Sequence, residues 1–181
     1  LDNRIGGYMI AEVARLLKEK KVKLPFGLYI VNAVQEEIGL RGAEMIAARI
    51  KPNVAIITDV CHDTTAPMYN KITSGDYTAG NGPVLTCGAA VHKKLLDLII
   101  DSAKKEDISF QRSASSRSTG TDTDAFAYSN GGVPAALISL PIKYMHTTVE
   151  TASKDDIEQV INLIIAFLKD FDLKYDFRYV K

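Results

Sequence analysis

Short apolar runs alternate with amphipathic helical patterns along the chain, and this alternation limits the possible fold more than any other feature. Runs with the length and composition of buried strands lie at residues 28–34, 54–60 and 134–140, with a weaker one at 108–114. Helical patterns lie at residues 5–20, 42–50 and 89–104, and in a last helix that Ser153 opens as N-cap. Strands that alternate with helices form layered sheets, so the sequence predicts a three-layer α/β/α domain with a mainly parallel sheet.

The overall composition excludes several classes of protein. A chain of 181 residues suffices for one domain with a core, and its 22 basic residues balance its 22 acidic ones. This balance gives no electrostatic support for nucleic-acid binding. No apolar run has the length of a membrane span, so no membrane partner is expected. Cys61 and Cys87 form neither a CxxC pair nor a disulfide framework, which favours a cytoplasmic location.

Two adjacent carboxylates, Glu36 and Glu37, follow the first predicted strand. Gly39 and Gly42 then break the pattern before the next helix, which places the pair at a strand-to-helix turn, where α/β sheets bind ligands. Two like charges side by side are costly to bury unless a cation neutralises them. A divalent metal, with one glutamate as ligand and the other as proton carrier, satisfies this condition. A solvated pair in a turn is the alternative.

Three more side chains, Asp2, Asp59 and His146, lie at or just beyond the ends of predicted elements. Loops that follow neighbouring strands converge on one edge of a sheet, so we expect these groups to meet the glutamates there. Four carboxylates and one imidazole suit two Zn²⁺, Mn²⁺ or Co²⁺ ions that share a bridging carboxylate. Taken singly, each has another explanation: an N-cap for Asp2, a loop cap for Asp59 and a surface histidine for His146.

On these motifs the chain resembles the dinuclear metallo-aminopeptidases of the tetrahedral, or glutamyl aminopeptidase, family. Some members of that family are also labelled deblocking aminopeptidases or endoglucanases. The matching stretches span nearly the whole chain in the family's order: LDNR at 1–4, VQEEIGLRGA at 34–43, TDV at 58–60, GTD at 120–122 and MHTTVE at 145–150. The double glutamate alone also occurs in other cocatalytic zinc peptidases.

The resemblance implies a role for each candidate residue in a metal-dependent aminopeptidase. Asp2 would bridge two divalent ions, zinc first and cobalt or manganese as alternatives. Glu37 and His146 would hold one ion, and Asp59 would hold the other. Glu36 would be the general base that takes a proton from water and passes it to the leaving amine.

The resemblance also implies partners. Peptides with a free N-terminus would be the substrates, and the full-length protein would be a homo-oligomer, with a twelve-subunit tetrahedron as the family's example. Asp122 and the long loop at residues 61–83 are candidate substrate contacts, since loops of this length in compact domains are usually functional. A helix cap is the competing explanation for Asp122.

The chain departs from the family pattern at one point. The family carries a further metal-binding histidine in an early His-x-Asp stretch and an inserted β domain, and residues 1–181 contain neither. His62 and His92 do not match that motif. We therefore expect residues 1–181 to be the C-terminal portion of a catalytic domain whose N-terminal part is missing, without a second domain. This segment alone should bind metal poorly and be inactive.

Two other functions are alternatives to the peptidase. A non-catalytic relative could keep the fold as an assembly or regulatory subunit, but it would not need Glu36, Glu37, Asp59 and His146 together. A glycosidase needs two carboxylates that flank the sugar bond about 5–9.5 Å apart. Two adjacent glutamates on one turn fit that requirement poorly.

Overall fold

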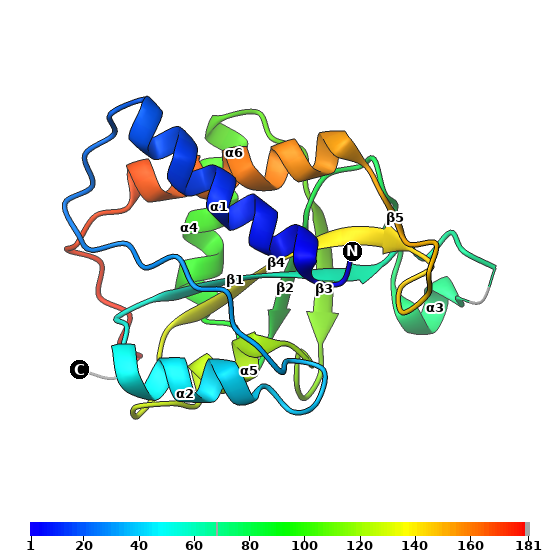
Figure 1. The fold of residues 1–181 in the computed structure, drawn as a ribbon, viewed down its shortest axis with the longest axis horizontal. Helices are drawn as coiled ribbons and strands as arrows, with labels where there is room; N and C mark the ends of the chain where they lie inside the picture. The colour runs from blue at the N-terminus through cyan, green and yellow to red at the C-terminus, as the bar shows by residue number, and fades with distance from the viewer. Residues whose placement is uncertain (68, 180–181) are drawn as a thin grey trace.

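A five-stranded sheet forms the middle layer of the computed structural model, which describes residues 1–67 and 69–179 (Figure 1). The strand order is β1-β4-β2-β3, and β5 pairs with β4 outside this path. The strands are β1 (Ala55–His62), β2 (Val84–Gly88), β3 (Gln111–Ser115), β4 (Ala135–Lys143) and β5 (Thr151–Ala152).

Most of the pairing in this sheet is parallel. β1 runs parallel to β4 along its whole length, from Ala55 opposite Ala135 to His62 opposite Ile142. β2 and β3 are also parallel, whereas β4 pairs antiparallel with β2 and with β5 over short stretches. β4 lies between β1 and β2, and all of its residues except Lys143 are buried.

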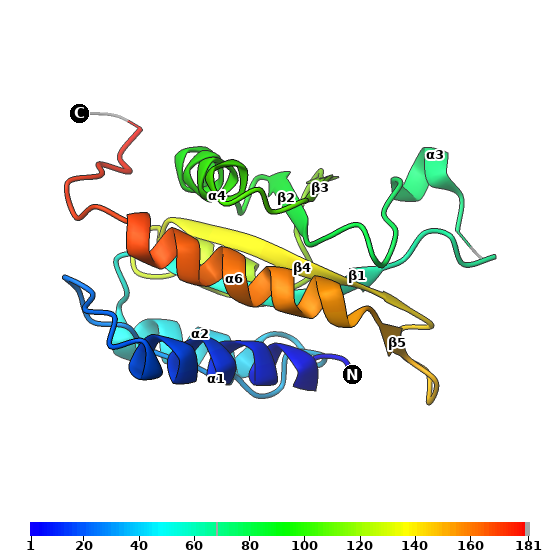
Figure 2. The ribbon, with the colours of Figure 1, turned by 90° about the horizontal axis from the view of Figure 1, so that it is seen from above.

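Helices cover both faces of the sheet, as Figures 1 and 2 show. Three of them pack side by side over β1, β4 and β2 respectively: α1 (Arg4–Glu19), α6 (Lys154–Asp170) and α4 (Lys93–Lys105). On the opposite face lie α2 (Arg41–Ile50) and α5 (Asp122–Ala127), which contact each other. A single helical turn, α3 (Lys71–Ser74), interrupts the long loop after β1. The predicted three-layer α/β/α organisation is confirmed.

The helices form where the sequence supplies a cap and an apolar stripe. Asn3 caps α1 by accepting the Gly6 N–H, and the stripe that includes Met9 and Val13 turns toward the core. Ser153 caps α6 in the same way. Fully buried side chains such as Met9 and Ile138 each stabilise the fold by roughly 1.5–3 kcal/mol.

The predicted helices correspond to α1, α2, α4 and α6, and the predicted strands at 54–60, 108–114 and 134–140 correspond to β1, β3 and β4. The short β2 was missed, because it directly follows the stretch assigned to a loop. β4 continues through Pro141, which lies opposite Cys61, and ends at Lys143. Residues 172–179 form no strand, and residues 180–181 lie outside the described residues.

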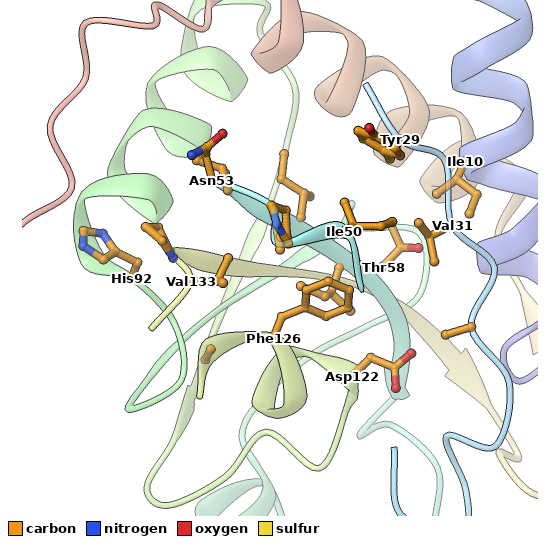
Figure 3. Close-up of a pocket in the computed structure, with 18 of the residues that line it drawn as sticks. Ile10, Tyr29, Val31, Ile50, Asn53, Thr58, His92, Asp122, Phe126 and Val133 are labelled. Carbon is orange, nitrogen blue, oxygen red and sulfur yellow. The ribbon is translucent and has the colours of Figure 1, made fainter. Parts of the chain in front are cut away.

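The predicted strand at residues 28–34 is also wrong. This segment has a strand-like composition, but it forms no ladder with any other described residue, and Tyr29 and Val34 are 69% and 64% exposed. A strand needs a neighbouring strand about 4.8 Å away, with which it forms backbone hydrogen bonds. Instead, residues 26–33 and residues 54–59 line a common cleft of about 1490 Å³, and Tyr29, Val31 and Thr58 are among its lining residues (Figure 3).

Membrane insertion receives no support from the helices. Within the ranges that the structure describes, none is both long and apolar enough to cross a bilayer.

We expect the rate of amide hydrogen exchange to differ between β4 and residues 28–34, although both segments are apolar. Amides of β4 are buried and paired on both sides, so they should exchange orders of magnitude more slowly than those of residues 28–34. Hydrogen-exchange mass spectrometry on the 181-residue chain measures this difference. Equal protection of the two segments would show that residues 28–34 pair with β1 in solution.

Candidate metal centre

Side chains from three distant segments converge at one edge of the sheet. Nε2 of His146 lies 3.1 Å from Oδ2 of Asp2 and 3.6 Å from Oε2 of Glu37. One ligand atom from each residue lies within 4.8 Å of the others. Ligand atoms about 2.0–2.2 Å from a tetrahedral zinc ion lie roughly 3.3–3.5 Å from one another. The two carboxylates and the imidazole therefore have the spacing and chemistry of ligands to one divalent ion.

Asp2 is placed by the start of α1. The N-cap of this helix is Asn3, so the simple N-cap explanation for Asp2 does not hold. Asn3 also donates from Nδ2 to the carbonyl oxygen of Thr58 at 2.8 Å, which ties the start of the helix to β1. The backbone N–H of Asp2 donates to Oε2 of Glu150 at 3.1 Å.

The other two candidate ligands, Glu37 and His146, lie in turns with unusual backbone geometry. His146 itself has φ 62°, and Gln35, which precedes the double glutamate, also has φ 62°. Residues other than glycine rarely adopt this left-handed conformation, and such residues concentrate at functional sites. The carbonyl oxygen of Glu36 accepts the N–H groups of Gly39 and Leu40, each at 3.0 Å, which closes the turn.

Asp59 lies inside β1 rather than at its end, which corrects the expected position. Its side chain is 7% exposed, and Oδ1 accepts the N–H of Val60 at 2.8 Å. Burial raises the pKa of Asp59 to about 7 although the Val60 N–H opposes it, and the charges of Glu36, Asp2 and Asp122 add to the increase. Asp59 is not one of the three clustered ligands, but it feels the same set of negative charges.

The pKa of Glu36 is also raised. Burial contributes most, followed by the negative charges of Glu37, Asp122 and Asp2, and His146 opposes them. A carboxyl group whose pKa moves toward neutrality is better matched to general acid–base work at neutral pH. Glu36 lines the same cleft as its neighbour Glu37.

Asp122 is the first residue of α5 and not its cap, because Thr121 caps the helix by accepting the Thr123 N–H. Its carboxylate lies beside β1 in the lining of the cleft (Figure 3). Oδ1 of Asp122 is buried without a hydrogen-bond partner in the described part of the chain, and burial raises the pKa of this carboxyl. A buried, unpaired carboxylate oxygen is costly without a cation or donor nearby.

The two remaining histidines have different surroundings. His62 ends β1, and its Nδ1 lies 2.7 Å from Oη of Tyr69. Burial lowers the pKa of His62, and the charge of His146 lowers it further, so His62 lies near the candidate centre. In the sequence, the one indication that His62 lies near the candidate centre is its position three residues after Asp59. His92 is half-buried and stacks on Tyr179.

The cysteines take no part in the cluster. Cys61 and Cys87 are both free, and burial raises the pKa of the Cys61 thiol to about 12. A thiol with so high a pKa stays protonated at neutral pH, so it is a poor metal ligand.

Comparison with solved structures assigns the class of protein. The fold matches a TET aminopeptidase from the marine sediment archaeon Thaumarchaeota archaeon SCGC AB-539-E09 with a TM-score of 0.88 and 31% identity, over 95% of this chain and 48% of that one. The dodecameric PhTET1-12s matches with a TM-score of 0.78 and 29% identity, over 94% of this chain and 49% of that chain. The fold is therefore that of an aminopeptidase domain.

The sequence comparison gives the family. The chain belongs to the M42 glutamyl aminopeptidase family, whose profile matches residues 1–163, and the resemblance found in the sequence is confirmed. A lysyl aminopeptidase of Pyrococcus furiosus is 39% identical over 170 residues, which are 94% of this chain and 47% of that protein. The chain thus spans about half the length of the relatives that it matches.

We expect Asp59→Asn to stabilise the chain at pH 8 in the presence of a chelator. The pKa of Asp59 is about 7 in the folded protein against an ordinary 3.8, so its stabilising contribution is complete below pH 4 and is lost as the pH rises through 7. A shift of this size corresponds to at most roughly 4 kcal/mol. Asparagine keeps the oxygen that accepts the Val60 N–H.

Calorimetric unfolding at pH 8 and pH 4 measures this effect. The gain in the free energy of unfolding should be present at pH 8 and absent at pH 4. The control is Asp101→Asn, which removes an exposed carboxylate on α4 and should change little at either pH. A destabilised Asp59→Asn variant at pH 8 would contradict the expected cost of ionising this buried group.

Proposed function

We propose that the full-length protein is a metal-dependent aminopeptidase that removes N-terminal residues from peptides. The observation that carries this proposal is the convergence of Asp2, Glu37 and His146 beside Glu36, in a chain of an aminopeptidase family. In this proposal Glu37 and His146 would hold one ion, Asp59 would hold a second, and Asp2 would contribute to holding both. Zinc suits this set of oxygen and nitrogen donors, and cobalt or manganese are the alternatives.

The residues present fit such ions. Asp2, Glu36 and Asp59 have raised pKa values, with burial as the largest cause and the charges of neighbouring carboxylates as a further one, and a bound cation would offset both. Asp122 adds a buried carboxylate oxygen without a partner in residues 1–67 and 69–179. When bound, two divalent ions would act as Lewis acids on a water molecule and on the scissile carbonyl group.

Glu36 is the proposed general base. It is adjacent to the ligand Glu37 in a turn whose backbone is fixed by hydrogen bonds, so its carboxylate is held beside the centre. It would accept a proton from the attacking water and return it to the nitrogen of the leaving amine. Its raised pKa favours the protonated form that the second transfer requires.

The substrate's ammonium group is proposed to bind among the carboxylates that line the cleft. Glu36 and Asp122 both line it, and the unpaired Oδ1 of Asp122 can accept a hydrogen bond from the ammonium. A charge-assisted hydrogen bond of this kind would select peptides with a free N-terminus.

We also propose that the protein works as a homo-oligomer in the cytoplasm. The dodecameric state of the structurally similar PhTET1-12s supports the homo-oligomer, and the free cysteines support the cytoplasmic location. Residues 1–181 are proposed to be the C-terminal portion of the catalytic domain. Only three candidate ligands cluster within the described residues, so this portion alone is proposed to be inactive.

Glu36→Gln in the full-length protein tests the general base. We expect kcat to fall by roughly 10²- to 10⁴-fold, because the amide cannot accept the proton, while the metal content stays unchanged. Steady-state hydrolysis of aminoacyl substrates and elemental analysis measure the two quantities. Glu44→Gln is the control, since Glu44 is exposed on the nearby helix α2. Full activity of Glu36→Gln would contradict the proposed role.

The number of metal ions bound per chain tests whether residues 1–181 carry only part of the proposed site. Elemental analysis should give about two divalent ions per full-length chain and one or none per 181-residue chain. Chelation should abolish peptide hydrolysis, and added Zn²⁺ or Co²⁺ should restore it. Two ions in the 181-residue chain, with hydrolysis that Glu36→Gln abolishes, would show that this portion carries a complete site. A metal-free, inactive full-length protein would indicate a non-catalytic relative.

A further inference from the structure

One carboxylate connects two of the three clustered ligands through their backbones. Oε1 of Glu150 accepts the N–H of His146 at 2.8 Å, and Oε2 accepts the N–H of Asp2 at 3.1 Å. Oε2 also accepts a hydrogen bond from the amino group of Leu1. Asp2 precedes α1, and His146 lies in the loop after β4, so each oxygen of Glu150 holds a different segment.

We propose that Glu150 is a positioning residue that sets the distance between Asp2 and His146 and thereby the metal affinity of the site. This inference rests on the proposed metal centre. Within the described residues, Glu150 makes no hydrogen bond to the side chain of Asp2 or His146 and does not line the cleft. It contacts both segments through their backbone N–H groups, and its charge also raises the pKa of Asp2.

The burial of Glu150 supports this role. Its side chain is only 8% exposed, although exposed positions are available to most glutamates. A buried carboxylate needs several donors to offset its lost hydration, and here two backbone N–H groups and the amino group of Leu1 supply them. With both oxygens occupied, the carboxylate group has little freedom to rotate, so the two segments it joins are fixed relative to each other.

The loop that carries His146 has other restraints, but they lie on its own side of the site. Met145 packs against the core, and Thr147 forms hydrogen bonds with Tyr144 and Val149 in the same loop. The side chain of His146 is 62% exposed. Among the hydrogen bonds of the described residues, those of Glu150 connect the backbone of His146 to the start of α1. Outer-shell groups that orient ligands typically change metal affinity by 10- to 100-fold when they are mutated.

Three substitutions separate positioning from charge. Glu150→Asp keeps the negative charge, but its side chain is one methylene shorter and cannot reach both N–H groups. Glu150→Gln keeps the length but has a single accepting oxygen, so one N–H loses its partner. Glu150→Ala removes both the charge and the contacts. Glu158→Gln, at an exposed position of α6, removes the same charge elsewhere and is the matched control.

The measurement is Co²⁺ binding to metal-depleted full-length protein, by competition with a chelator and by the visible absorption of the bound ion. We expect Glu150→Asp, Glu150→Gln and Glu150→Ala each to weaken Co²⁺ binding about 10- to 100-fold and to alter the absorption spectrum. Glu158→Gln should bind within about twofold of the wild type. The melting temperature in chelator should change much less than that of the Co²⁺-loaded protein.

Each of the following results would contradict the proposal. Wild-type affinity in Glu150→Asp with weakened binding in Glu150→Gln would show that only the charge matters. Equal losses of melting temperature with and without Co²⁺ would assign Glu150 a purely structural role. Unchanged binding in all three variants would refute positioning while the aminopeptidase proposal stands. A wild-type protein that binds no Co²⁺ would refute both.

Discussion

The main physical constraint on this structure is electrostatic: several carboxylates lie close together at one edge of the sheet, and their negative charges repel one another. At 4 Å, two like charges repel by about 1 kcal/mol in water and by about 4 kcal/mol near a protein surface. Burial is the largest cause of the raised pKa values of Asp2, Glu36 and Asp59, and this repulsion adds to it. Asp63 shows the contrast: burial raises its pKa, but hydrogen bonds from Thr65 and the Ala79 N–H outweigh burial and leave the pKa lowered. Asp59 accepts one such hydrogen bond, from the Val60 N–H, and its pKa is still raised, so a cation is the simplest compensation.

The sheet topology explains why these groups meet. β1 and β4 are parallel neighbours, so the loops that follow them leave the sheet on the same side. This places His62, at the end of β1, near the loop that carries His146. The start of α1 is tied to β1 through the hydrogen bond from Asn3 to Thr58, which brings Asp2 to the same edge. Long-range pairing thus gathers groups that are far apart in the sequence.

Helices and strands that follow from a local pattern of residues could be predicted from the sequence. Features that depend on pairing between distant segments could not. The stripe of α1 and the apolar run of β4 are local, and both elements were found. Residues 28–34 have an equally apolar composition, but no partner strand lies beside them in the described structure. Asp59 was expected at a strand end because the apolar run stops there, whereas pairing with β4 extends β1 to His62. The types of candidate ligand could be predicted from sequence, but a contact between Asp2 and Glu150 could not.

The exposure of the clustered ligands determines how the site can be kept rigid. The side chains of Glu37 and His146 are 58% and 62% exposed, whereas that of Asp2 is 13% exposed. Exposed side chains are not fixed by packing, so their positions must follow from the backbone that carries them. In this chain that restraint comes from the closed turn at Glu36 and from the carboxylate of Glu150. An exposed candidate site and a defined arrangement of its side chains are therefore compatible, because backbone hydrogen bonds hold the segments that carry those side chains.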